Sequence, residues 1–395
     1  MTSVSRAARS ARLPFVNALF FPVATLHAAV MLPLWVGGLL GAWQLPAGLD
    51  FRAAHAHEML LGFGMAVVAG YLLGPQPMAV TVTLLGLWVT ARIGFMTAPE
   101  HALALTSTAL FAAGVAWRVV PRFALAAKQW RNRIVAPVVL ALALLTFVGP
   151  GVLLHADSGP QQASLLLQTT VLLLGLLMFY MGGRILAAAI AGHLQRRGRK
   201  LLARVQPRLE GAALLALIGS LLLQPVEQPL ASTIQGCLLC IAGLLTWVRL
   251  IRWQLWHCLD RPDLVALASG YAWLGIGLLM LGLARLGAPV MPSVGVHSLT
   301  MGALGTLTLT VMARTRLLYR FRDADVMKRT YFSALLISLA TLARIAVDLP
   351  FLNARFDVAL AAAAVLWSLA CLGILPALFA STVVARHGRY GLRID

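Results

Sequence analysis

Two histidines and a glutamate stand together at the start of a long apolar run, in the order His55-Ala56-His57-Glu58-Met59. Imidazole is a ligand for iron, copper and zinc, and a neighbouring carboxylate can orient a ligating ring. On insertion scales, a charged residue costs about 2.5 to 3.5 kcal/mol at the centre of a membrane helix. A charged residue at the mouth of the helix costs less than one at its centre. Three ionisable groups in four positions nevertheless predict a metal or cofactor site.

The spacing of the two histidines limits what they can do together. On an ideal helix, positions two apart are separated by about 200°, so His55 and His57 cannot both ligate one atom. Either they serve different centres, or the helix begins at Ala56 and the preceding loop frees His55. A polar cap without any cofactor is the alternative, since Glu58 is favourable in the first turn of a helix.

Other ionisable residues interrupt the apolar runs. His297 opens a run that contains Gly302, Ala303 and Gly305, and such small residues allow another helix or a flat ligand to approach closely. Arg344 and Asp348 are four residues apart and can pair on one helix face. The remaining candidates are His27 as a metal ligand and Arg92 as a cation for a cofactor carboxylate.

The composition identifies the class of protein that holds these residues. Hydrophobic residues make up 60% of the 395 residues and charged residues only 11%, against about 25% charged in soluble domains. Apolar runs of about 18 residues or more can cross a bilayer. We therefore predict an all-α, polytopic membrane bundle with spans at 15–42, 55–73, 77–96, 101–120, 134–155, 164–191, 207–224, 230–250, 264–284, 294–313, 330–349 and 358–385.

The basic residues give this bundle an orientation. Of the 32 lysines and arginines, 26 fall at one set of span ends, and the opposite loops hold only Arg52, Arg285 and Arg355. By the positive-inside rule both termini are then cytoplasmic. We expect a basic segment at 1–14, one transmembrane domain at 15–385 and a basic tail at 386–395. The same rule accounts for the net charge of +19 without nucleic acid.

This topology gathers the ionisable residues on the outer side. His55, His57, Glu58 and His297 open spans that start outside, and His27 lies near mid-bilayer. Arg92, Arg344 and Asp348 lie near the outer ends of their spans. An apolar cavity between helices with histidine on two walls suits haem.

The residues resemble the NnrS family, haem- and copper-containing membrane proteins of the bacterial nitric-oxide response. Three blocks carry the resemblance: His55-Ala56-His57-Glu58-Met59-Leu60-Leu61-Gly62-Phe63, Met181-Gly182-Gly183-Arg184-Ile185 and His297-Ser298-Leu299-Thr300-Met301-Gly302-Ala303-Leu304-Gly305-Thr306. The chain departs from the family's pattern after the third block, where Arg316-Leu317-Leu318-Tyr319 replaces a Gly-His-Thr-Gly-Arg turn. That departure predicts a divergent member and puts a shared cytoplasmic function in doubt.

The resemblance implies a protein of the bacterial inner membrane that binds a b-type haem, with copper as an open alternative, and binds or helps to detoxify nitric oxide. It implies His55, His57 and His297 as ligands, Glu58 and Asp348 as their supports, and Arg344 and Arg92 as partners of haem carboxylates. The bilayer and nitric oxide are then the expected partners. One other hypothesis is a secondary transporter in which the outer histidines and the Arg344–Asp348 pair relay protons or bind substrate. A third is an oxidase-like enzyme, which ranks low because only His27 lies deep in the bundle and no two histidines are adjacent.

Overall fold

The computed structural model describes residues 15–125, 133–155, 159–318, 324–348 and 355–387. These residues form helices throughout, and the extended pairing among them is one isolated bridge between Phe15 and Pro75. The predicted all-α class is confirmed. The predicted terminal segment 1–14 and most of the tail 386–395 lie outside the described residues.

Twelve helical rods follow one another in the order of the twelve predicted spans. Two rods, the second and the tenth, consist of several consecutive helical segments. The rods are α1 (Asn17–Leu39); α2, η3 and α3 (Arg52–His57, Glu58–Gly64 and Met65–Leu72); α4 (Met78–Thr97); α5 (Ala102–Leu125); α7 (Val135–Leu154); α8 (Pro160–Arg196); α9 (Pro207–Leu223); α10 (Pro229–Arg252); α11 (Pro262–Arg285); α12, η5, α13 and η6 (Pro292–His297, Ser298–Gly305, Thr306–Ala313 and Arg314–Leu318); α15 (Ala324–Ala346); and α16 (Phe356–His387).

Within the described ranges, nine of these rods are long and apolar enough to cross a membrane when judged by length and hydropathy alone. The second rod is not among the nine, and it carries His55, His57 and Glu58 in its first turns; α9 has only 17 residues. The start of α15 carries charged residues such as Lys328 and Arg329. All three nevertheless run alongside the others, so the chain is a polytopic membrane protein.

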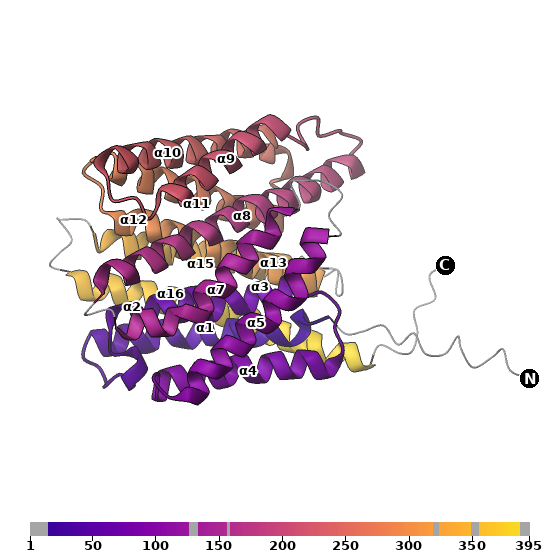
Figure 1. Ribbon diagram of the computed structural model, residues 1–395. Coiled ribbons are helices and arrows are strands. Elements are labelled where there is room, and N and C mark those ends of the chain that lie inside the picture. Colours follow the sequence, from indigo (N-terminus) through magenta and orange to yellow (C-terminus); the bar gives the residue numbers. More distant parts are fainter. Residues whose placement is uncertain (1–14, 126–132, 156–158, 319–323, 349–354, 388–395) are drawn as a thin grey trace, which may run out of the picture.

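The rods lie side by side, and the two ends of the bundle differ (Figure 1). The α10 helix packs against α9 and α11, and α16 packs against α1 and α15. The α8 helix has 37 residues, or about 55 Å at 1.5 Å per residue. A hydrocarbon core is about 30 Å thick, so α8 extends beyond the membrane. Its far end projects on the side where α16 ends, which we call the basic end, and α2 and α12 begin at the opposite, histidine end.

The second and tenth rods share an organisation that the sequence did not predict. Each starts with six α-helical residues ending in a histidine, continues as a π-helix, η3 or η5, and returns to an α-helix. π-helical turns are rare and occur frequently at functional sites. The apolar pattern is the same for both helix types, so only the hydrogen-bond register distinguishes them.

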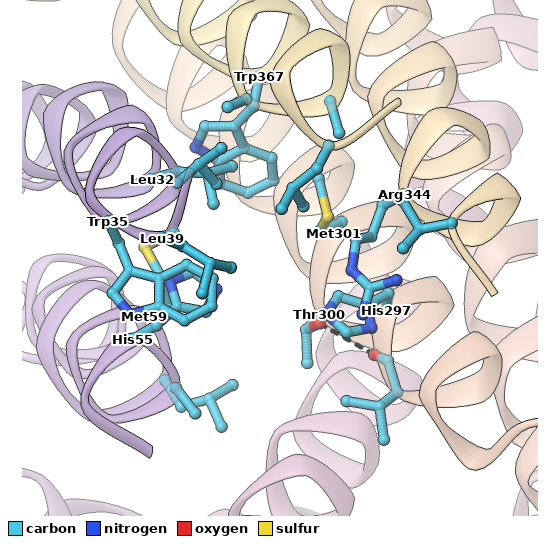
Figure 2. Close-up of a pocket in the computed structure, with 18 of the residues that line it drawn as sticks. Leu32, Trp35, Leu39, His55, Met59, His297, Thr300, Met301, Arg344 and Trp367 are labelled. Carbon is cyan, nitrogen blue, oxygen red and sulfur yellow. Dashed lines mark hydrogen bonds between the residues drawn. The ribbon is translucent and has the colours of Figure 1, made fainter. Parts of the chain in front are cut away.

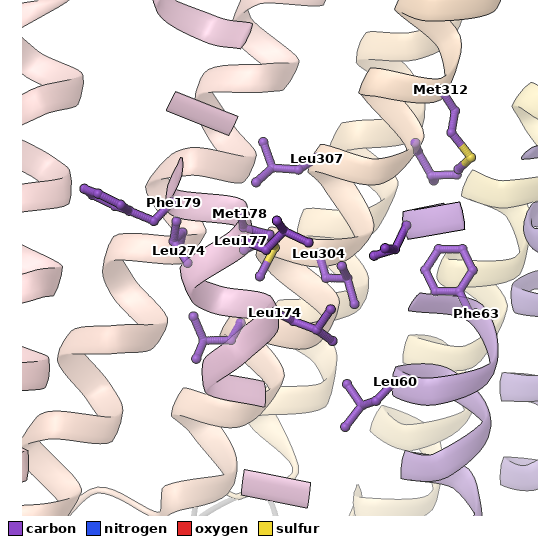
Figure 3. Close-up of a cluster of buried hydrophobic side chains, with 14 of the residues drawn as sticks. Leu60, Phe63, Leu174, Leu177, Met178, Phe179, Leu274, Leu304, Leu307 and Met312 are labelled. Atoms are coloured by element: carbon purple, nitrogen blue, oxygen red, sulfur yellow. The ribbon is translucent and has the colours of Figure 1, made fainter. Parts of the chain in front are cut away.

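Close packing joins these two rods to α8. Figure 3 shows Leu60 and Phe63 of η3, side chains of α8 such as Leu174, and Leu304 of η5 in one apolar cluster. Lipid is as apolar as leucine, so hydrophobic burial provides little driving force between membrane helices, and complementary packing takes its place. The packed cluster fixes where the two histidine-bearing ends stand.

Candidate functional site

A cavity of about 310 Å³ opens between these rods at the histidine end. Its volume lies within the range of small-molecule and cofactor sites. Figure 2 shows His55 and Met59 on one wall, His297, Met301 and Arg344 on the facing wall, and Trp367 between them. The walls come from α1, α2 with η3, α12 with η5, α15 and α16. Most of the lining is aliphatic or aromatic, which favours an apolar ligand with a few polar groups.

His55 is held in place by an aromatic contact. Its ring stacks on Trp35, with ring centroids 4.6 Å apart and planes 22° apart. The Nδ1 atom of His55 is buried and has no hydrogen-bond partner. Leaving a buried polar atom unpaired costs about 1–3 kcal/mol. An imidazole kept in this state on a cavity wall is consistent with a site built for a ligand.

His297 is oriented by hydrogen bonds one helical turn back. Its Nδ1 donates to the carbonyl oxygen of Ser293 at 2.9 Å, and the Ser293 hydroxyl lies 3.2 Å from the same nitrogen. Donation from Nδ1 fixes the tautomer and leaves Nε2 with the lone pair that a metal needs. The ring is therefore prepared for ligation.

Arg344 brings a positive charge to the wall that carries His297. Its Nη1 donates to Oδ2 of Asp348 at 3.2 Å, as the spacing predicted, and its Nη2 donates to the Ser293 hydroxyl at 2.9 Å. Ser293 thus touches both the guanidinium and the histidine ring. This arrangement holds a cation and an imidazole in a fixed relation at the cavity.

A second, closed cluster surrounds Glu58, and none of its members lines the cavity. Arg92 Nη1 donates to Oε1 of Glu58 at 2.6 Å, and His57 Nδ1 lies 3.2 Å from the same oxygen. His27 Nε2 lies 3.4 Å from Oε2. A β-carbon at Gly62 would sit 3.2 Å from Arg92 Nη1 and 3.3 Å from His27 Nε2, so glycine there lets both side chains reach the carboxylate.

The structure therefore divides the predicted site residues into two sets. It brings His55, His297 and Arg344 together, with Asp348 supporting the arginine, and places His27, His57, Glu58 and Arg92 in the closed cluster. Among the described residues, no three His, Cys, Asp or Glu side chains are arranged to hold a metal ion. Arg92 pairs with Glu58, so its position does not suit the predicted role beside a cofactor carboxylate.

The sequence did not identify the cavity residues Trp35, Met59, Met301 and Trp367, nor Ser293, which hydrogen-bonds to His297 and Arg344. A signal for the methionines was present. His55 and His297 are each followed by methionine four residues later, and side chains at that spacing lie on one helix face. The two tryptophans carry no such signal, because their partners are distant in the chain.

The order, spacing and geometry of these elements can be compared with known families. A family model described as NnrS protein matches residues 13–384. The chain belongs to the NnrS family. No curated protein and no solved structure matched it. Membership in NnrS, together with the bundle, makes the chain a multi-pass membrane protein of a family associated with the nitric-oxide response.

The second NnrS block, and Arg314 beyond the third block, make buried contacts toward the basic end of the bundle. A β-carbon at Gly183 would lie 3.0 Å from both Arg249 Nη2 and the Tyr271 hydroxyl. Arg249 Nη1 donates to that hydroxyl at 2.8 Å. Arg314, eight residues after the third block, pairs with the buried carboxylate of Asp263. The contacts of Gly183 and Arg314 join α8, α10, α11 and η6 at a place away from the cavity.

Proposed function

We propose that this protein binds haem in the cavity and binds nitric oxide there. The observation that supports the proposal is the pair His55 and His297, which stand on opposite walls of one cavity with Arg344 beside them. The residues present fit the group: imidazoles for iron, an arginine for carboxylates, indole rings for a flat macrocycle, and a buried Nδ1 without a partner on His55.

When bound, haem would supply an iron atom able to bind nitric oxide. His297, oriented by Ser293, is the better prepared ligand, and His55 faces the same space from the other wall. Arg344 would hold a haem carboxylate by charge-assisted hydrogen bonds. Trp35 and Trp367 line the cavity, and their indole rings would shield a bound haem from water. Nitric oxide is small, neutral and soluble in lipid, so a site within the inner membrane can receive it directly.

The donor set also suits copper. Each wall offers an imidazole and a thioether, from His55 with Met59 and from His297 with Met301. Thioether and imidazole are ligands that copper(I) accepts. Metal analysis of the purified protein separates copper from haem iron, because each element is measured independently of colour.

A transporter is the second candidate, and one structural observation favours it. Interrupted helices at corresponding places in a chain point to a transport site, and the second and tenth rods are interrupted alike by η3 and η5. In that reading Arg344 and Asp348 would handle protons or an anionic substrate. The interruptions are π-helical and stay hydrogen-bonded, which ranks this function below haem binding.

An absorption spectrum of the purified protein tests the first proposal. Cells supplied with ample haem and copper should yield a protein with a Soret band that shifts when nitric oxide is added. His297→Ala and His55→Ala should weaken or abolish the band, whereas the exposed His101→Ala should not change it. A colourless, metal-free protein from such cells would contradict haem binding and favour the transporter.

A further inference from the structure

A groove of about 520 Å³ lies at the basic end, and it shares no lining residue with the cavity. It is lined by Arg197 and Arg199, which follow α8, and by Trp256, His257, Leu259 and Asp260 at and after the short helix η4 (Leu255–Cys258). None of these residues takes part in the proposed haem site. The groove therefore calls for an explanation of its own.

A tight turn places the two arginines at the groove. The α8 helix ends at Arg196, and Gly198 has a φ of +69°, the left-handed conformation that glycine adopts without strain. Backbone hydrogen bonds close this turn, from Gly198 to Gln195 at 3.1 Å and from Arg199 to Leu194 at 2.9 Å. The turn thus fixes Arg197 and Arg199 on either side of one glycine.

Polar contacts orient both guanidinium groups and leave them with donors to spare. Arg197 Nη2 donates to Oδ2 of Asp260 at 2.8 Å, and His193 Nε2 lies 3.2 Å from the other carboxylate oxygen. Arg199 Nη1 donates to Nδ1 of His257 at 2.9 Å. A guanidinium has five N–H donors in a fork that matches phosphate oxygens. Asp260 offsets one charge, so the two arginines keep the groove cationic.

Charge and apolar surface occur together around the groove. Trp256 is 54% exposed and Leu259 is 65% exposed. The connections that border it, and the helix ends beside them, add exposed cations, namely Arg196, Lys200, Arg204, Arg208 and Arg252. Water alone would favour the cations but not the apolar side chains. A membrane surface with negative headgroups favours both, because tryptophan prefers the interface and basic clusters there attract anionic lipid.

We propose that this groove binds the headgroup of an anionic phospholipid of the cytoplasmic leaflet. The phosphate lies against Arg197 and Arg199, and Trp256 and Leu259 contact the start of the acyl chains. The chemistry recognised is a phosphodiester attached to an apolar tail. The site is independent of haem, so it stands whether or not the cavity holds a cofactor.

The test measures thermal unfolding of the full-length protein in detergent, with phosphatidylglycerol, phosphatidylcholine or inorganic phosphate added in turn. Phosphatidylglycerol should raise the unfolding temperature at lower concentration than phosphatidylcholine, and phosphate should have little effect. A cation near an anionic membrane surface contributes about 1 kcal/mol, which corresponds to about five-fold in affinity. In the variant R197Q/R199Q, the half-maximal concentration of phosphatidylglycerol should therefore rise at least about five-fold. Phosphatidylcholine should act as on the parent protein.

Two further variants keep the result interpretable. R118Q/R329Q removes two exposed arginines from the basic ends of α5 and α15, so it matches the loss of charge and should change the concentration less than about two-fold. Arg199→Gln alone should show part of the loss without freeing Asp260. An equal rise of the half-maximal concentration in R118Q/R329Q would show that general surface charge, and not this groove, attracts the lipid. Equal stabilisation by phosphate would show a free-phosphate site. Either result overturns the proposal.

Discussion

His55 and His57 stand two residues apart, and their side chains have different surroundings. His55 stacks on Trp35 at the cavity, whereas His57 stacks on Phe95, with centroids 4.1 Å apart, and contacts Glu58. The helical spacing predicted that the two rings would diverge. It could not predict what each would meet, because Trp35 and Phe95 come from other rods. The difference gives each residue its own testable consequence.

The closed cluster depends on Glu58 for charge balance. Glu58→Gln leaves the guanidinium of Arg92, which is 4% exposed, without its counter-charge. Breaking a buried pair by removing one partner costs about 3–5 kcal/mol, so thermal unfolding in detergent should begin well below the parent temperature. Glu227→Gln, at an exposed position, should leave it unchanged. A Glu58→Gln protein as stable as the parent would contradict the central role of this carboxylate.

Arg344 and Ser293 should differ in their effects on haem affinity, if the cavity binds haem as proposed. Arg344→Gln removes a charge-assisted bond worth about 1.5–3 kcal/mol, or about ten- to hundred-fold in the dissociation constant. Ser293→Ala removes a neutral hydroxyl contact worth about 0.5–1.5 kcal/mol, or about two- to ten-fold, and His297 keeps its bond to the backbone carbonyl. Titration of the haem-free protein measures both. An unchanged haem affinity in Arg344→Gln would show that this arginine does not contact the bound haem.

At the scale of elements, the π-helical segments of the second and tenth rods are the feature that the sequence did not predict. Runs of apolar residues predicted twelve spans and their order, because length and hydropathy determine whether a segment can cross a bilayer. They did not predict η3 or η5, since a π-helix keeps the same apolar composition. Nor did they predict the full length of α8, which exceeds the predicted span 164–191 at both ends, because hydropathy marks where a segment leaves the bilayer and not where its helix stops. The cavity lies where the two π-helices face each other, so its lining was only partly predictable.

Gly62, one of two glycines in η3, allows a test of how tightly the interrupted rod is packed. In Gly62→Ala the new β-carbon would lie 3.2 Å from Arg92 and 3.3 Å from His27, and both must shift. Overpacking of this kind costs about 1–3 kcal/mol. Gly86→Ala is the matched control, because no atom lies within 4 Å of its β-carbon, and it should be neutral or stabilising by up to about 1 kcal/mol. Equal unfolding temperatures for the two variants would show that the contacts at Gly62 are loose.

At the scale of the whole molecule, the bundle separates two kinds of chemistry. The histidine end holds the cavity, and the basic end holds the long α8, the cationic groove and the pairs around Arg249 and Asp263. The sequence predicted this division from the distribution of arginine and lysine. The positive-inside rule predicts that the basic end is cytoplasmic, and the cavity would then lie toward the outer face of the membrane.

Thiol labelling in intact cells checks that orientation. Ala98→Cys places an exposed thiol between α4 and α5 at the histidine end, and Gln195→Cys places one near the projecting end of α8. A membrane-impermeant maleimide should label the first variant before lysis and the second only after it, with the parent protein as the background for its four native cysteines. Charged side chains at the basic end resist transfer across the membrane during insertion, so the orientation should be uniform. Labelling of Gln195→Cys in intact cells would reverse the topology, and the cavity would then receive its ligand from the cytoplasm.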